Sequence, residues 1–171
     1  MSRPGLGEES INTGRTCCRP IMSNRLEIAG RALQRPLCNH CLGRLFASVS
    51  RGLSNDQRGE IVRSSLPGSP APPADSSECY VCKGLFLELE KFAKIAAKAS
   101  EGLEFNNYLV GTKVDAELRE REEAFWTEVG AAETESIKTE LNREIGKLLE
   151  NKLGKQVEFT NPDMVFLVDT Q

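Results

Sequence analysis

The stretch Cys79-Tyr80-Val81-Cys82-Lys83-Gly84 divides this sequence into two parts of different composition. An earlier stretch, Cys38-Asn39-His40-Cys41, has the same Cys-x-x-Cys spacing. Each pair predicts a tight turn that directs two thiolates at one point, and two such turns complete a tetrahedral shell around Zn²⁺. We therefore expect Cys38, Cys41, Cys79 and Cys82 to bind one zinc ion. The ion is expected to be structural, because four protein ligands leave no open position for water.

Other interpretations of the cysteines remain open. The pairs could be thioredoxin-like redox sites or free thiols, although neither pair lies between a strand and a helix of a βαβ unit. His40, the single histidine, could replace one cysteine as a ligand. Arg44 and Lys83 follow the pairs and could offset the charge of four thiolates. Cys17 and Cys18 lie near the amino terminus, and we treat them as incidental.

The composition indicates a globular protein. Of the 171 residues, 39% are hydrophobic and 27% are charged, which favours neither a disordered chain nor a membrane protein. No long apolar run and no apolar leader are found, so we expect a cytoplasmic protein. The net charge of −3 is unevenly distributed, because residues 1–63 carry ten Arg against five acidic residues, and residues 64–171 carry twelve basic against twenty acidic residues. The arginines could bind phosphate in a bidentate manner, or they could simply decorate solvated helices.

The sequence predicts an α+β chain of three parts. We expect a flexible tail at 1–20, an Arg-rich zinc-binding helical module at 21–84 with a Pro-rich loop at 67–77, and an α/β domain at 85–171. The expected helices cover 23–34, capped by Ser23 or Asn24, then 42–47, a segment from 55 to about 66, 85–102, 115–129 and 135–153, and the expected strands cover 103–112, 157–159 and 163–169.

Three details of this prediction concern side-chain burial. Ile95 is placed on the apolar stripe of helix 85–102, and Ile61 and Val62 on the apolar side of the helix from 55. Strand 163–169 is expected to be buried on both faces. The carboxylates of 115–129 are interpreted as a solvated helix face; they are Glu117, Glu120, Glu122 and Glu123.

No catalytic constellation is evident from the residue types. A Cys/His nucleophile would use cysteines that are assigned to the metal, and no glycine-rich phosphate loop of the Gly-x-x-x-x-Gly-Lys-Thr type occurs. Residue chemistry alone therefore predicts a metal-stabilised binding module.

Several motifs in a fixed order resemble a known family. The first cysteine pair continues as Leu42-Gly43-Arg44-Leu45-Phe46-Ala47, and the second as Lys83-Gly84. The remaining motifs are Ser54-Asn55-Asp56-Gln57-Arg58-Gly59, Tyr108-Leu109-Val110-Gly111-Thr112 and the segment from Glu135 to Lys147. From about Leu37 to Asp169 the chain resembles the amino-terminal half of the archaeal-type tRNA pseudouridine synthases, which modify uridines 54 and 55 in the tRNA T-loop.

The resemblance implies a Cys₄ zinc element joined to a THUMP-type RNA-binding domain that holds the acceptor end of tRNA. It also implies that the catalytic domain follows this region, so we expect a THUMP domain without its last strand and assign no catalytic residue. The chain would then be a fragment, a split-gene subunit that works with a separate catalytic subunit, or a stand-alone tRNA-binding protein.

The resemblance also suggests which residues contact RNA. Val110-Gly111-Thr112-Lys113 is expected to be a strand-to-helix turn that approaches a phosphate, and helix 135–153 offers polar side chains beside its apolar stripe. The candidate RNA-binding residues are Arg44, Arg58, Gly111, Thr112, Lys113, Lys138, Asn142, Arg143 and Lys147. Alternatively, the cations of this helix pair with Glu140, Glu144 and Glu150. At the level of function, the alternatives are a zinc-ribbon interaction protein of the transcription or translation machinery and a structural zinc module without a nucleic-acid partner.

Overall fold

The computed structural model describes residues 18–171, which form several helices and one small sheet. This is the α+β class that the sequence predicts. The elements are α1 Cys18–Ala32, α2 Asn39–Arg44, α3 Asn55–Ser65, the 3₁₀ helices η1 Ser76–Glu78 and η2 Leu85–Leu87, α4 Leu89–Ala99, β1 Asn107–Lys113, α5 Ala116–Val129, α6 Ile137–Leu153, β2 Gln156–Val157 and β3 Met164–Asp169. None of these helices has the length and apolar character that crossing a membrane requires.

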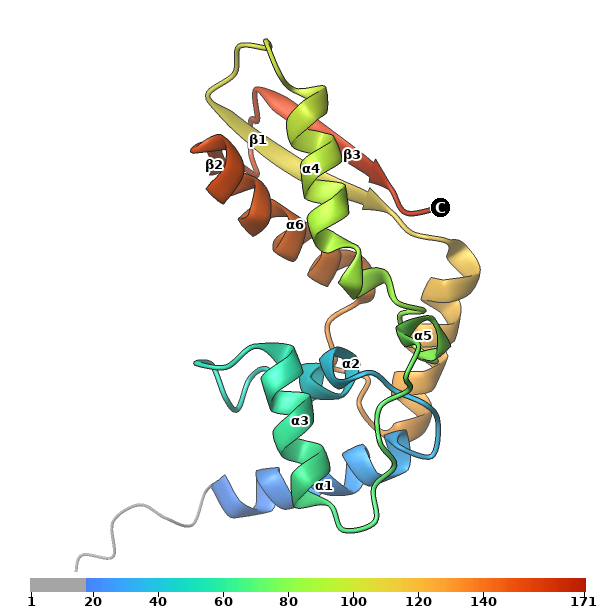
Figure 1. The fold of residues 1–171 in the computed structure, drawn as a ribbon. Helices are drawn as coiled ribbons and strands as arrows, with labels where there is room; N and C mark the ends of the chain where they lie inside the picture. Colours follow the sequence, from blue (N-terminus) through green and yellow to red (C-terminus); the bar gives the residue numbers. More distant parts are fainter. Residues whose placement is uncertain (1–17) are drawn as a thin grey trace, which may run out of the picture.

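The elements form two groups. Figure 1 shows α1, α2 and α3 together in one group, and the sheet with α4 and α6 in the other, while α5 lies along the side between them. The Pro-rich segment 67–77 has no regular structure before η1, as its prolines predict.

The sheet is parallel and has the strand order β2-β1-β3. Tyr108 and Val110 of β1 are buried, and the Tyr108 hydroxyl donates a hydrogen bond of 2.9 Å to the Gly146 carbonyl of α6. This face of the sheet is therefore covered by helices. On the opposite face, Val165 and Leu167 of β3 are 58% and 75% exposed. The prediction that strand 163–169 is buried on both faces is wrong, because among residues 18–171 helices cover only one side.

Helix α6 agrees closely with the sequence pattern. Of the five residues predicted on its apolar stripe, Leu148 is partly buried and four are fully buried, namely Ile137, Leu141, Ile145 and Leu149. The Ser136 hydroxyl accepts a hydrogen bond from the Thr139 amide at the start of the helix, and Gly154 ends it in the left-handed conformation, with φ at 64°.

Two glycines allow α2 and α3 to pack backbone against backbone. A Cβ atom at Gly43 would lie 1.8 Å from the Asn55 carbonyl oxygen, and one at Gly59 would lie 1.9 Å from the Asn39 carbonyl oxygen. Any larger residue at either position would push the two helices apart.

Several predicted boundaries and faces need correction. Helix α1 begins at Cys18, so the cap at Ser23 or Asn24 is wrong and residues 18–20 are helical; the rest of the predicted tail and Cys17 lie outside the described residues. Helix α2 begins at Asn39, earlier than residue 42, because the Cys38 sulfur caps it. Ile61 and Ile95 are 53% and 59% exposed, so their predicted places on the apolar faces of α3 and α4 are wrong. The buried sides of these helices are formed by neighbouring residues such as Val62 and Ala96.

Candidate metal centre and surrounding charges

The four predicted cysteine ligands lie together. Cys38 and Cys41 belong to the start of α2, and Cys79 and Cys82 form the turn before η2; their sulfur atoms all lie within 4.8 Å of one another. The Cys38 and Cys82 sulfurs are 3.7 Å apart. Ligands of a tetrahedral ion with metal–sulfur bonds of about 2.3 Å are separated by about 3.8 Å. The four sulfurs are therefore compatible with one bound metal ion.

The protein surrounding the sulfurs also suits a cation. The Cys38 amide donates to the Cys79 sulfur at 3.3 Å, and the Cys41 amide donates to the Cys38 sulfur at 3.4 Å. Burial raises the pKa of the Cys41 thiol, whereas hydrogen bonds from neighbouring sulfurs, first that of Cys38, lower the pKa of Cys79. Four buried sulfurs at this spacing cannot all be thiolates unless a cation neutralises them.

Arg63 is a neighbour of this centre that the sequence did not single out. Its guanidinium donates to the Leu37 carbonyl and, at 2.7 Å, to the Asn39 side chain. Burial lowers the pKa of Arg63, and the negative charge of Cys38 opposes that shift. Arg63 therefore ties α3 to the first cysteine turn and places positive charge near its sulfur.

A second cluster, the Arg44 cluster, consists of Arg44, Glu122 and Glu140. The Arg44 side chain is 1% exposed, and its Nη2 lies 2.8 Å from the Glu122 carboxylate and 2.5 Å from the Glu135 carbonyl oxygen. Its Nε lies 3.6 Å from Glu140. The cluster joins α2 to both α5 and α6.

Glu122 is not on a solvated face, and that prediction is wrong. Its side chain is 4% exposed; it accepts hydrogen bonds from Trp126 Nε1 at 3.2 Å and from the Ile137 amide at 2.9 Å. Glu122 thus binds Arg44 with one oxygen and the first amide of α6 with the other. Its neighbours Glu117, Glu120 and Glu123 are exposed, as predicted.

The Glu140 carboxylate also contacts other polar side chains of this region. Asn55 donates to it at 2.6 Å, and His40 Nε2 lies 3.3 Å away. Burial acts to raise the pKa of Glu140, but His40, Arg44 and Arg143 outweigh it and hold that pKa below its usual range. The His40 ring faces Glu140 and stacks on Phe86 at 4.0 Å, and it is not one of the clustered metal-ligating groups.

The structure separates the candidate RNA-binding residues. Arg44 is buried in its cluster, and Arg58 donates to the Ser50 carbonyl at 2.7 Å and to Asn55 at 2.6 Å, so both side chains serve internal contacts. Gly111 and Thr112 lie within β1 and do not form a strand-to-helix turn. Thr112 is buried and contacts Asn142.

The other candidates are on the surface. Lys113 lies 3.4 Å from Asp169. Arg143 pairs with Glu140 at 3.1 Å and Lys147 with Glu144 at 3.1 Å, as in the alternative interpretation of this helix. Arg143 also pairs with Glu135, at 2.5 Å. Lys138 is exposed and makes no ion pair with another residue of the described part of the chain.

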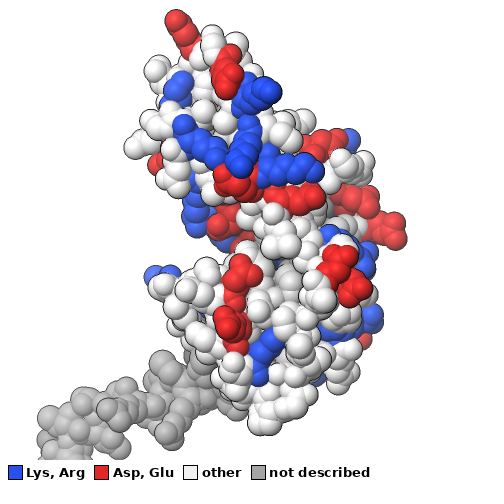
Figure 2. All heavy atoms as spheres, viewed as in Figure 1, with Lys and Arg blue, Asp and Glu red and all other residues white. Residues whose placement is uncertain are grey.

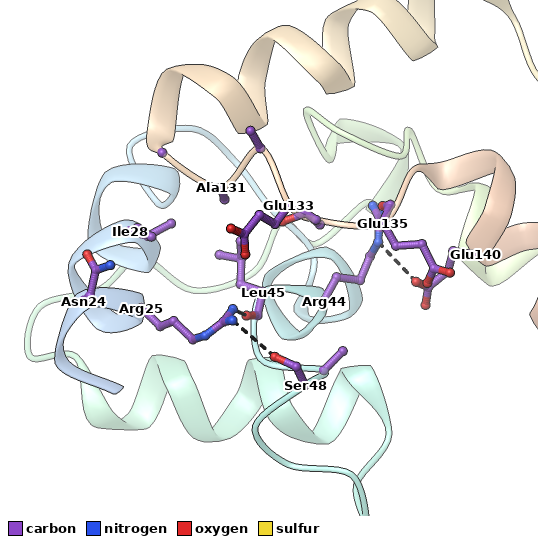
Figure 3. Close-up of a pocket in the computed structure, with 14 residues that line it drawn as sticks. Asn24, Arg25, Ile28, Arg44, Leu45, Ser48, Ala131, Glu133, Glu135 and Glu140 are labelled. Atoms are coloured by element: carbon purple, nitrogen blue, oxygen red, sulfur yellow. Dashed lines mark hydrogen bonds and ion pairs between the residues drawn. The ribbon is translucent and has the colours of Figure 1, made fainter. Parts of the chain in front are cut away.

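The arginines of the amino-terminal part mostly bind the protein itself. Arg25 donates to the Leu45 carbonyl and to Ser48, and Arg31 donates to the Val129 carbonyl. Figure 3 shows Arg25 and Arg44 at a cavity of about 620 Å³ between α1, α2 and the segment 130–135. In Figure 3 both guanidinium groups already point at protein oxygens.

Comparison with known proteins gives a consistent result. Residues 92–169 match the family described as Pus10 THUMP domain, archaeal. Several relatives are named tRNA pseudouridine synthase Pus10. That of Pyrococcus furiosus is 38% identical over 80% of this chain and 35% of the relative, and that of Halorubrum lacusprofundi is 39% identical over 84% of this chain and 35% of the relative. That of Caldivirga maquilingensis is 35% identical over 85% of this chain and 45% of the relative. No solved structure matches the chain.

These relatives are considerably longer than the region that they share with this protein. The chain spans about a third to under half of their length. The chain nevertheless matches the THUMP family model over residues 92–169, and it has the predicted α+β fold with four clustered cysteines. Over most of its length the chain is therefore similar to part of the archaeal tRNA pseudouridine synthases named Pus10, and its residues 92–169 match the THUMP domain of that family.

Proposed function

We propose that this chain is a tRNA-binding, zinc-stabilised part of a tRNA pseudouridine synthase and acts by binding. The observation that carries the proposal is the THUMP match at residues 92–169, together with relatives that are named tRNA pseudouridine synthases. Isomerisation of a T-loop uridine is assigned to the portion of these relatives that the chain does not match. The catalytic part would be supplied either by another portion of the same protein or by a separate subunit, and the acceptor end of tRNA is the expected ligand.

We further propose zinc as the metal of the cysteine cluster. Four thiolates with sulfur spacings near those of a tetrahedron are the donor set of structural zinc sites. Such thiols stay available in a reducing compartment such as the cytoplasm. The ion would hold the module at residues 21–84 together across its Pro-rich loop, and the domain at 85–171 would contact RNA.

Metal analysis of the purified full chain tests the zinc proposal. One zinc per chain is expected, released together with about four titratable thiols when a chelator is added. A chain that contains no metal and keeps an unchanged unfolding transition would contradict it.

A filter-binding series with tRNA across salt concentrations tests the RNA-binding proposal. Saturable binding that weakens as salt increases is expected, because cations of the protein displace counterions from phosphates. The absence of binding at low salt would refute the proposal. Pseudouridine formation by the purified chain alone would refute the assignment of catalysis to another part.

One observation favours a second function, contact with another protein. Val165 and Leu167 form an exposed apolar strip on β3 beside the partly buried Leu109 of β1. A zinc-ribbon interaction protein would use such a surface. Binding to a protein partner that Leu167→Lys abolishes, without any binding to RNA, would favour this alternative.

A further inference from the structure

A lysine-rich face on α4 stands out in a domain that is otherwise acidic. Lys91, Lys94 and Lys98 are spaced by three and four residues, so they lie on one side of the helix. The opposite side is buried, with Phe92, Ala93 and Ala96 packed into the core. All three lysines are exposed. Figure 2 shows Lys and Arg side chains gathered over the group that contains α4 and α6.

Acidic residues lie at both ends of this face, Glu88 and Glu90 at the start of α4 and Glu101 just after its end. Glu88 lies 3.9 Å from Lys91, and Glu90 pairs with Lys152 of α6 at 2.5 Å. Lys94 and Lys98 make no ion pair with any of residues 18–171. Lys94 and Lys98 are therefore not fixed in ion pairs, with Glu90 four residues before Lys94 and Glu101 three residues after Lys98.

This arrangement is unfavourable for the isolated helix. Like charges four residues apart, as in Lys94 and Lys98, repel each other, and they cost roughly 0.2–0.5 kcal/mol per pair. A face that serves only solubility would mix charges of both signs, as the outer face of α6 does with Arg143, Glu144 and Lys147. The stretch of α4 from Lys91 to Lys98 contains no acidic residue, and its three lysines point to a negatively charged partner.

The dimensions of the face suit a phosphate backbone. Lys91 and Lys98 are seven residues apart, which corresponds to about 10 Å along the helix axis. One strand of double-stranded DNA carries a phosphate about every 3.4 Å of its axis, so a face of about 10 Å is long enough to meet more than one phosphate of a nucleic-acid backbone. Ile95, 59% exposed, lies between the lysines and offers an apolar contact to the sugars.

We propose that Lys91, Lys94 and Lys98 of α4 bind the sugar–phosphate backbone of RNA without reading its sequence. This inference rests on the proposed RNA-binding function and assigns a surface to it. The surface is distinct from the candidates on β1 and α6 that the sequence analysis identified.

The double variant Lys94→Gln/Lys98→Gln of the zinc-loaded full chain tests the assignment. Glutamine has nearly the helix propensity of lysine, so far-UV circular dichroism and the melting temperature should be unchanged. The plot of log Kobs against log salt for tRNA binding should become less steep by about 1.4–1.8, because two phosphate contacts are lost. The matched control Lys94→Arg/Lys98→Arg keeps both charges and should keep the wild-type slope.

The outcomes separate this inference from the proposed function. If the wild type binds tRNA and the glutamine variant binds with the same slope, the α4 surface is refuted and RNA binding stands. If the wild type does not bind tRNA at all, both are refuted. Poly-glutamate serves as the probe for an acidic protein partner. If it binds the wild type as tightly as tRNA does, and the glutamine variant binds both ligands more weakly by the same factor, the face recognises acidic proteins and the RNA assignment is overturned.

Discussion

The replacement Arg44→Met tests whether the buried Arg44 cluster holds the two groups of elements together. Methionine keeps most of the volume of the side chain but leaves Glu122 and Glu140, whose side chains are 4% and 3% exposed, without their shared cation. Removing one partner of a buried ion pair typically costs about 3–5 kcal/mol, because the remaining charge stays buried and uncompensated.

Urea unfolding of the zinc-loaded protein, followed by fluorescence, measures this cost. Trp126 is the single tryptophan, it is 3% exposed, and it donates to Glu122, so its emission reports on this cluster. With a urea dependence of about 2 kcal/mol per M, the midpoint should fall by roughly 1.5–2.5 M.

The control is Arg143→Met on α6. The Arg143 side chain is 41% exposed and also pairs with Glu140, at 3.1 Å. Surface ion pairs contribute about 0–1 kcal/mol, so this variant should shift the midpoint by less than about 0.5 M. Equal shifts for both variants, or an unchanged midpoint for Arg44→Met, would show that burial of the cluster does not stabilise the fold.

Three further predictions concern packing, pH and the metal. Gly59→Ala should destabilise the protein by about 2 kcal/mol or more, because its Cβ would meet the Asn39 carbonyl. Gly30→Ala should instead stabilise the protein by about 0.5–1 kcal/mol, because the space around Gly30 in α1 is open. Thermal melts of both variants measure these changes. Since the folded pKa of Glu140 lies below its unfolded value of about 4.5, its contribution is present above that pH and is lost as pH falls through the folded value. The stability of wild type relative to Glu140→Gln should therefore shrink below pH about 4.5 in urea titrations, and a constant difference would contradict the pKa argument. Cys79→Ser should abolish stoichiometric metal binding and broaden the unfolding transition, as measured by metal analysis and calorimetry. One metal ion per chain and an unchanged transition would show that another residue takes the place of Cys79 as a ligand.

The features that were correctly predicted depend on short-range pattern. The stripe of α6 and its glycine stop follow from spacing within one helix, and the cysteine cluster follows from two Cys-x-x-Cys turns. The predicted start of α2 was wrong because its capping residue is an unusual one. Helix α2 begins at Asn39 because a cysteine sulfur serves as its cap, a role that is usually filled by serine, threonine, aspartate or asparagine.

The burial of charged residues could not be predicted in this way. Arg44 and Glu122 are 78 residues apart, and the residue spacing within either segment does not indicate that the two side chains meet. The exposed strip at Val165 and Leu167 is the converse case, since an apolar strand appears buried on both faces unless one knows which face the helices cover.

The sequence by itself predicted the α+β class, the clustering of the four cysteines and the resemblance to the tRNA pseudouridine synthases, because these depend on residue type and on spacing along the chain. Only the tertiary structure decided which charges face the solvent. It assigned Arg44 and Arg58 to the interior and left Lys94 and Lys98 on α4 without an ion pair to any of residues 18–171. The physical reason is that the energy of a charge depends on its neighbours in space, and folding brings those neighbours from distant parts of the chain.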